Sequence, residues 1–197
     1  MGSSPSESSS PSCSCSVSEE GSPPPDRRAL PRRTLSQVVV ELLVTLCWAG
    51  RSPLAPGTVG SLAALPLGWW MAQLGWPGKL ALLGVVNLGG ALAVNAYLHR
   101  PASAAGGGTG EHDPPEVVID ELGGCLIALA FVPWQLPWVA AAFALFRLLD
   151  ILKPGPIRLI DRATRNGWGV MGDDVVAGLA AGLLAAGLRW LWQAVGP

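Results

Sequence analysis

The sequence predicts an all-α protein: a compact, membrane-embedded bundle of mostly apolar helices, with polar motif loops gathered on one face. Three observations lead to this prediction. Half of the 197 residues are hydrophobic and only 14% are charged, against roughly 25% in an ordinary soluble domain. The apolar residues form long runs without the alternation that is typical of strands. Short blocks rich in charge and glycine separate these runs.

The first 36 residues differ from the rest of the chain. Ser, Pro and charged residues dominate there, and few apolar residues are present to form a core. Such a segment is expected to be disordered, and it lacks the apolar stretch of a secretory signal. The sequence therefore predicts a disordered tail over residues 1–36 and one helical membrane domain over residues 37–197.

The apolar runs of this domain predict its helices in order. The second run ends at the turn signal Trp76-Pro77-Gly78, and the uncharged third run has about the length that spans a bilayer. Two shorter runs follow, on either side of a Pro-bounded turn. The last run is rich in Gly and Ala, which favour close packing of helices in a membrane. The predicted helices cover Gln37–Trp48, Leu62–Trp76, Leu80–Leu98, Leu122–Val132, Trp138–Leu149 and Val175–Val195.

The alternation of runs and blocks also predicts an orientation. If each run enters and leaves the bilayer, every charged block falls on one side, and its Lys and Arg mark that side as cytoplasmic. The shortest runs cannot cross a hydrocarbon core of about 30 Å, so they are expected to be re-entrant or core helices. Seven of the nine tryptophans lie where apolar runs end, as interfacial aromatic residues do, although core positions are the alternative. These are Trp69, Trp70, Trp76, Trp134, Trp138, Trp190 and Trp192.

Four acids occur as two adjacent pairs, Asp120-Glu121 and Asp173-Asp174. Neighbouring carboxylates repel each other unless a cation lies between them. Clustered oxygen ligands with almost no histidine favour Mg²⁺, Ca²⁺ or Mn²⁺ over zinc. Each pair also lies near the predicted start of a helix, where a carboxylate can cap free N–H groups instead. A metal site and a set of helix caps therefore both remain open.

The polar block after the fifth run carries bases as well as acids. Arg147, Asp150 and Lys153 are spaced so that they share one face of a helix. Arg158, Asp161 and Arg162, spaced i, i+3 and i+4, could form a second such face. Arginine binds phosphate through two N–H groups and lysine binds it as a point charge. A network of ion pairs within the protein is the alternative interpretation.

The stretch APGTVGS, residues 55–61, is a glycine-rich turn that leads into the second predicted helix. Gly57 and Gly60 permit close approach of the backbone, and Ser61 is a good N-cap for a helix that starts at Leu62. A loop of this kind at a helix N-terminus is suited to bind an anion. The G-K-[ST] ending of a nucleotide-binding P-loop is missing.

Several classes of function are excluded. The net charge of −1 provides no attraction to nucleic acid. The chain has no C-x5-R motif of a cysteine phosphatase, no suitable pair of histidines, no D-x-D-x-T motif of an aspartyl-phosphate enzyme and no acidic motif of a lipid head-group transferase. The remaining hydrolytic chemistry uses metal-activated water, with carboxylates as ligands or base.

Four stretches of the chain occur in a recognisable order: SPLAPGTVGSLAALP, DPPEVVIDELGG, FRLLDILKPGPIRLIDR and GWGVMGDDVVAG. Together they resemble the motifs of the phosphatidylglycerophosphatase A family, from about Gly50 to Gly182. The resemblance implies a Mg²⁺-dependent membrane phosphatase that hydrolyses phosphatidylglycerophosphate to phosphatidylglycerol and phosphate. It also implies a bacterial inner or plasma membrane, with the active site facing the cytoplasm.

The resemblance also assigns roles to residues of this chain. It implies Mg²⁺ ligands at Asp120, Glu121, Asp173 and Asp174. Catalytic positions are implied at Asp120, Glu121, Arg147, Asp150, Lys153, Asp161 and Arg162. Substrate-binding positions are implied at Gly57, Thr58, Gly60 and Ser61. The sequence does not assign the catalytic base or the oligomeric state.

Two other classes of protein remain as alternatives: a small helical membrane transporter for a divalent cation or anion, and a non-catalytic binding module. A transporter needs acids near the middle of its apolar runs, whereas the acids here lie at the ends of runs. A binding module does not need so many paired acids. Both alternatives are therefore less favoured than a phosphatase.

Overall fold

The structure, a computed structural model, describes residues 34–52, 55–99, 116–153 and 166–195. These residues form six α-helices and one short 3-10 helix, and none of them lies in a strand. The predicted all-α class is confirmed. The predicted tail lies, up to residue 33, outside the described residues. The helices are α1 (Leu35–Val44), η1 (Ala49–Arg51), α2 (Pro56–Ala72), α3 (Trp76–Leu98), α4 (Ile119–Ala130), α5 (Leu136–Leu152) and α7 (Gly167–Val195).

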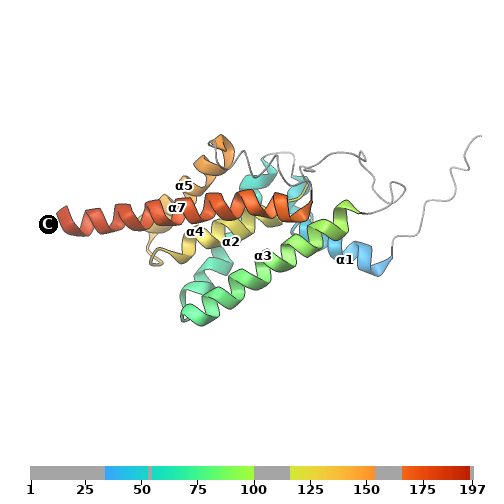
Figure 1. Cartoon of the computed structure of the whole chain (residues 1–197), viewed down its shortest axis with the longest axis horizontal. Coiled ribbons are helices and arrows are strands. Elements are labelled where there is room, and N and C mark those ends of the chain that lie inside the picture. Colours follow the sequence, from blue (N-terminus) through green and yellow to red (C-terminus); the bar gives the residue numbers. More distant parts are fainter. Residues whose placement is uncertain (1–33, 53–54, 100–115, 154–165, 196–197) are drawn as a thin grey trace, which may run out of the picture. The chain divides into compact units, whose positions relative to one another are not determined.

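Helix α4 forms the core of the bundle, because α2, α3, α5 and α7 all pack against it (Figure 1). Every residue of α4 except Glu121 is buried. Its contact with α7 is the most extensive, and glycines on both helices permit it. A Cβ added to Gly178 of α7 would lie only 2.3 Å from the carbonyl oxygen of Gly124. The central helices therefore cross too closely for any larger side chain at this point.

Helix α2 begins earlier than the sequence predicted, and this corrects two expectations. It starts at Pro56, because proline fits the first turn of a helix, where its missing N–H is not needed. The stretch APGTVGS therefore forms the first turns of α2 rather than a loop before it. Ser61 is not an N-cap: it lies inside the helix, and its hydroxyl donates to the carbonyl oxygen of Gly57 at 2.9 Å.

Helices α3 and α7 also begin earlier than predicted. Trp76-Pro77-Gly78 is not a turn but the first turn of α3, after the N-cap Gly75, and again a proline occupies the first turn. Helix α7 begins at Gly167 instead of Val175. The side chain of Asn166 caps it by accepting hydrogen bonds from the N–H groups of Trp168 and Gly169 at 3.0 and 3.2 Å. The glycines and acids of GWGVMGDD resemble a loop in sequence, but tertiary packing keeps them helical.

One end of the bundle gathers the polar motifs, as predicted, and is called the polar end here. It consists of the ends of α1, α3 and α5 and the starts of α2, α4 and α7. The N–H of Val118, just before α4, donates to the carbonyl oxygen of Val44 in α1 at 3.1 Å. The N–H of Gly167 in α7 donates to Asn95 Oδ1 in α3 at 2.9 Å. These bonds join helices that are far apart in the sequence.

The opposite end, called the tryptophan end, is where α2, α4 and α7 finish and α3 and α5 begin. A Cβ on Gly68 of α2 would lie 3.0 Å from Leu129 of α4 and 3.1 Å from Trp134 in the segment between α4 and α5. Helix α2, helix α4 and this segment therefore meet there. Seven of the nine tryptophans of the chain belong to this end. Trp76, Trp190 and Trp192 are 61%, 70% and 66% exposed, so they are not core residues.

Helices α3 and α7 are long and apolar enough to cross a membrane, each with a mean hydropathy of 1.6 in its most apolar window. Only 17% and 28% of the residues in those windows are buried, so neither resembles the core helix of a soluble protein. Leu80, Val85 and Leu92 of α3 and Leu183 of α7 are exposed. Soluble monomers rarely leave such apolar faces uncovered.

Candidate active site

The start of α4 places two carboxylates at the polar end. Asp120 and Glu121 lie in the first turn of this helix, where free N–H groups and the helix dipole favour negative charge. Asp120 is buried, and Glu121 is half-buried. Their position alone does not distinguish a helix cap from a ligand.

Asp173 and Asp174 lie about two turns inside α7, which begins at Gly167. No free N–H group is available that far into a helix, so the capping role that the sequence left open does not apply to them. Both residues are buried, with 4% and 3% of their surface exposed. Burying a carboxylate is costly unless a cation or donor compensates it, so these two acids require a specific partner.

Three of the four paired acids converge. Asp120, Glu121 and Asp174 each bring one carboxylate oxygen to within 4.8 Å of the others, and we call them the acidic triad. Glu121 Oε2 and Asp174 Oδ2 are buried and have no hydrogen-bond partner among the described residues. Burial raises the pKa of Glu121, and the nearby Asp150 carboxylate contributes in the same direction. Clustered carboxylate oxygens suit a hard divalent cation such as Mg²⁺, so the triad fits such an ion.

Two bases flank the triad, and each is paired with an acid. Within α5, Arg147 Nη1 lies 2.6 Å from Asp150 Oδ2. At the end of the same helix, Lys153 Nζ lies 2.5 Å from Asp173 Oδ2. The fourth paired acid, Asp173, therefore contacts a lysine, whereas its neighbour Asp174 belongs to the triad.

Helix α2 reaches the site through Gly57. A Cβ on this residue would lie 2.4 Å from Glu121 Oε1 and 3.2 Å from Arg147 Nη2. Only glycine, therefore, lets the first turn of α2 approach both side chains. A Cβ on Gly60 would lie 2.9 Å from Val118, so this glycine brings α2 against the segment that precedes α4. Thr58 is half-buried in the same turn.

The structure brings most of the predicted site residues to one place. Asp161 and Arg162 lie outside the described residues. Ser61 is placed differently from the prediction, because its hydroxyl is bonded within α2. The predicted residues that meet at the polar end are Gly57, Asp120, Glu121, Arg147, Asp150, Lys153, Asp173 and Asp174.

A second charged network at the polar end is not evident from the sequence motifs. Arg51 Nη2 lies 2.6 Å from Glu41 Oε1, and its Nε lies 3.0 Å from Glu116 Oε2. These carboxylates, Glu116 first, raise the pKa of Arg51. The lone acid Glu41 inside the first apolar run was a usable signal, because such residues usually pair. The network ties α1 and η1 to the segment that leads into α4.

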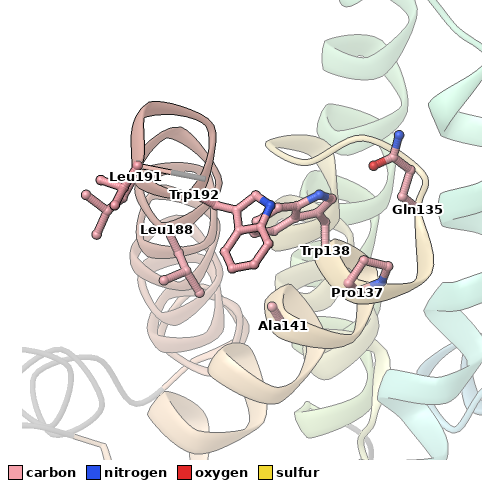
Figure 2. Close-up of a pocket in the computed structure, with 8 residues that line it drawn as sticks. Gln135, Pro137, Trp138, Ala141, Leu188, Leu191 and Trp192 are labelled. Carbon is pink, nitrogen blue, oxygen red and sulfur yellow. The ribbon is translucent and has the colours of Figure 1, made fainter. Parts of the chain in front are cut away.

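An apolar cavity of about 910 Å³ lies between the start of α5 and the end of α7. Figure 2 shows Trp138 and Trp192 pointing toward one another across it. Leu188, another lining residue, follows Asp174 by 14 residues, or about 21 Å along a helix axis. The described residues that line the cavity carry no charge. This cavity belongs to the tryptophan end and is separate from the acidic triad.

Comparison with known proteins assigns the chain to a family. A model of the family described as phosphatidylglycerophosphatase A matches residues 42–189. The chain belongs to the phosphatidylglycerophosphatase A family. The matched region includes the acidic triad, both base–acid pairs and Gly57. The resemblance of the four motifs is confirmed, and the chain is a member of a family of phosphatases that act on phosphate monoesters.

Individual relatives agree with this assignment. The chain is 45% identical to phosphatidylglycerophosphatase A of Escherichia coli (strain K12) over 141 residues, which cover 69% of this chain and 76% of the relative. It is 40% identical to phosphatidylglycerophosphatase A of Haemophilus influenzae over 143 residues, 69% of this chain and 80% of the relative. A relative from Bacteroides thetaiotaomicron, provisionally named a phosphatidylinositol-3-phosphatase, is 38% identical over 154 residues, 73% of this chain and 89% of the relative. No solved structure matches the chain.

Proposed function

We propose that this protein is a Mg²⁺-dependent lipid phosphatase that hydrolyses phosphatidylglycerophosphate to phosphatidylglycerol and phosphate in phospholipid biosynthesis. The observation that supports this most is the acidic triad, with two buried and one half-buried carboxylate, together with the two base–acid pairs at the same end. The relatives named phosphatidylglycerophosphatase A supply the substrate. Residues 37–197 are proposed as the catalytic domain, and the region matched by the family model lies within these bounds.

Asp120, Glu121 and Asp174 are proposed to hold the metal ion. A Mg²⁺ ion supplies positive charge that polarises a phosphoryl group and acidifies water. Glu121 Oε2 and Asp174 Oδ2 have no hydrogen-bond partner among the described residues, and a cation would compensate for their burial. In the sequence Asp173 was also an expected ligand, but its contact with Lys153 favours another role.

Arg147 and Lys153 are proposed to bind the phosphoryl oxygens. Charge on these oxygens is stabilised in the transition state by fixed cations. Arg147 is already oriented by Asp150, and its guanidinium lies beside the first turn of α2 at Gly57. The positive end of that helix dipole adds to the attraction for an anion. The chain's own residues thus provide a pocket for a phosphomonoester next to the triad.

The membrane is proposed to surround α3 and α7, so that the acyl chains of the substrate lie in the bilayer and its phosphate reaches the polar end. The exposed tryptophans of the opposite end suit a membrane interface. Arg51, Arg147 and Lys153 belong to the polar end, whereas the described bases nearer the tryptophan end are Lys79 and Arg189. By the positive-inside rule, the polar end is proposed to face the cytoplasm.

The test is phosphate release from a panel of lipids by the purified full-length protein in detergent micelles. The panel contains phosphatidylglycerophosphate, phosphatidic acid and phosphatidylinositol-3-phosphate, each with Mg²⁺ or with EDTA. We expect Mg²⁺-dependent release, fastest from phosphatidylglycerophosphate. Full activity in EDTA, or in both Glu121→Gln and Asp174→Asn, would contradict the metal-dependent mechanism. Faster release from another lipid would reassign the substrate.

A further inference from the structure

Asp173 and Asp174 are adjacent in the sequence but face different parts of the site. Consecutive residues of an α-helix are about 100° apart around its axis, so their side chains do not face the same neighbour. Asp174 contributes an oxygen to the acidic triad. Asp173 Oδ2 instead contacts Lys153 Nζ of α5 at 2.5 Å. The helix geometry therefore separates these two acids into two environments.

The backbone of Lys153 supports a specific task for its side chain. Lys153 is the C-cap of α5 and has a φ of 39° and a ψ of 64°. Its N–H closes the helix by donating to the carbonyl oxygen of Leu149 at 2.9 Å. This left-handed conformation is one that glycine adopts readily and that disfavours any residue with a Cβ. Strained backbone of this kind is concentrated at functional sites, which supports a task for the Lys153 side chain.

The two side chains of the Lys153–Asp173 pair are buried to different extents. The side chain of Asp173 is 5% exposed, whereas that of Lys153 is 27% exposed. Asp173 is therefore the more deeply buried partner, and the lysine side chain is the one that reaches solvent. An ammonium has three N–H donors, so a lysine that contacts a carboxylate can also donate to an anion.

The Arg147–Asp150 pair of the same helix is more enclosed, with side-chain exposures of 16% and 13%. Lys153 is thus the more accessible of the two bases beside the triad. In each pair, an acid holds a base beside the triad.

We propose that Lys153 binds the phosphate group of the substrate, and that Asp173 is a positioning residue that holds the Lys153 ammonium in place rather than a ligand of the metal ion. This inference rests on the proposed function and deepens it. The recognised group is a phosphomonoester or its product, inorganic phosphate. Inorganic phosphate is therefore a sufficient probe for binding.

The experiment measures metal binding and phosphate binding separately on the purified full-length protein in detergent. Mn²⁺ binding is followed by electron paramagnetic resonance, and inorganic phosphate binding by calorimetry in the presence of Mn²⁺. In Asp173→Asn we expect the Mn²⁺ dissociation constant to stay within about threefold of wild type, while phosphate binds roughly tenfold more weakly. In Asp174→Asn we expect Mn²⁺ binding to be lost.

A second variant separates the side chain of Lys153 from its backbone role. Lys153→Gly suits a φ of 39°, but it leaves the buried Asp173 carboxylate without its lysine, so we expect an unfolding temperature below that of wild type. Binding is therefore measured at a temperature at which circular dichroism shows the variant to be folded. Phosphate should bind roughly tenfold more weakly, with partial rescue in Lys153→Arg. In steady state, both Lys153→Gly and Asp173→Asn should raise KM for the lipid. Lys79→Gln, which removes a lysine of α3 near the tryptophan end, is the control and should bind phosphate like wild type.

Two results would overturn the inference: loss of Mn²⁺ binding in Asp173→Asn to the same extent as in Asp174→Asn, or unchanged phosphate affinity in Lys153→Gly. A different result would overturn only the proposed function. If Mn²⁺ and phosphate bind as expected in every variant but no lipid of the panel releases phosphate, the roles of Lys153 and Asp173 remain supported and the lipid phosphatase activity does not.

Discussion

The two ends of the helix bundle differ in which side chains they bury. At the polar end, Asp120, Asp173 and Asp174 are 7%, 4% and 3% exposed. At the tryptophan end, Trp190 and Trp192 are 70% and 66% exposed. An ordinary soluble domain would reverse this arrangement, with aromatic residues inside and carboxylates in water.

The difference supports the proposal that the polar end carries the catalytic site and that the tryptophan end meets a membrane interface. Buried carboxylates cost stability unless a cation compensates them, so their retention at the polar end indicates a task. Exposed indoles cost little where lipid replaces water. The same long helix, α7, contributes Asp174 to one end and Trp192 to the other. Variants at the polar end should therefore affect catalysis, whereas variants at the tryptophan end should leave the catalytic residues intact.

The largest effect is expected from Asp174→Asn, which removes one charge of the acidic triad at nearly constant volume. Phosphate release from phosphatidylglycerophosphate should fall at least about 100-fold, because a metal ion supplies several kcal/mol of transition-state stabilisation. Glu116→Gln is the matched control, since this acid also lies at the polar end but pairs with Arg51. The rate of phosphate release by Glu116→Gln should stay within about threefold of wild type. Equal losses of activity in the two variants would contradict a specific role for the acidic triad.

Removal of the metal ion should lower the free energy of unfolding, and this effect should depend on residues of the polar end and not on residues of the tryptophan end. At a hundred times its dissociation constant, a bound ion adds about 2.7 kcal/mol to the free energy of unfolding. Thermal unfolding in detergent, with Mg²⁺ or with EDTA, measures this difference. Trp192→Ala should keep the stabilisation by Mg²⁺, and Asp174→Asn should lose it. A Mg²⁺ effect that survives in Asp174→Asn would place the ion elsewhere.

Gly57→Ala tests the packing of α2 against the site. The added Cβ would lie 2.4 Å from Glu121 Oε1, so the carboxylate or the helix must move. Activity should fall by about tenfold or more, because displacements near 1 Å can cost up to about 100-fold. Gly89→Ala is the control, since a Cβ on Gly89 meets no atom within 4 Å. Wild-type activity in Gly57→Ala would contradict the placement of α2.

The smallest effect is expected from Arg51→Ala, which leaves Glu41 buried without its arginine. Because the Arg51 side chain is 43% exposed, the loss of unfolding free energy should be about 1 kcal/mol. Chemical denaturation in detergent measures it. Arg189→Ala in the last turns of α7 provides the comparison and should change stability less. A larger loss in Arg189→Ala would mean that the polar end is not where charge stabilises the fold.

The sequence predicted the all-α class and the placement of the polar motifs at one end of the bundle. Both follow from the lengths of the apolar runs and the positions of the polar blocks between them, which can be read directly from the local composition. It misplaced the starts of α2, α3 and α7. Pro56 and Pro77 signal turns in a sequence but also fit the first turn of a helix. Gly167, at the start of α7, resembles a loop residue in the sequence. In the structure it lies against α3, where a Cβ on it would be 2.5 Å from the carbonyl oxygen of Ala91.

The candidate site was predicted as a set of residues but not as an arrangement. Asp120, Glu121 and Asp174 were among the expected ligands, and the structure brings them together. The contact of Asp173 with Lys153 could not be predicted, because it depends on the direction in which each residue of α7 faces and on the left-handed backbone of Lys153. Side-chain direction follows from the exact start of a helix, which the sequence did not define.

The central claim is that Asp120, Glu121 and Asp174 together bind a divalent cation. The most direct measurement is a Mn²⁺ titration, followed by electron paramagnetic resonance, of the purified wild-type protein and of a variant with Asp120→Asn, Glu121→Gln and Asp174→Asn combined. We predict one bound ion per wild-type chain and none at this site in a triple variant that circular dichroism shows to be helical. Equal binding by both proteins would contradict the claim.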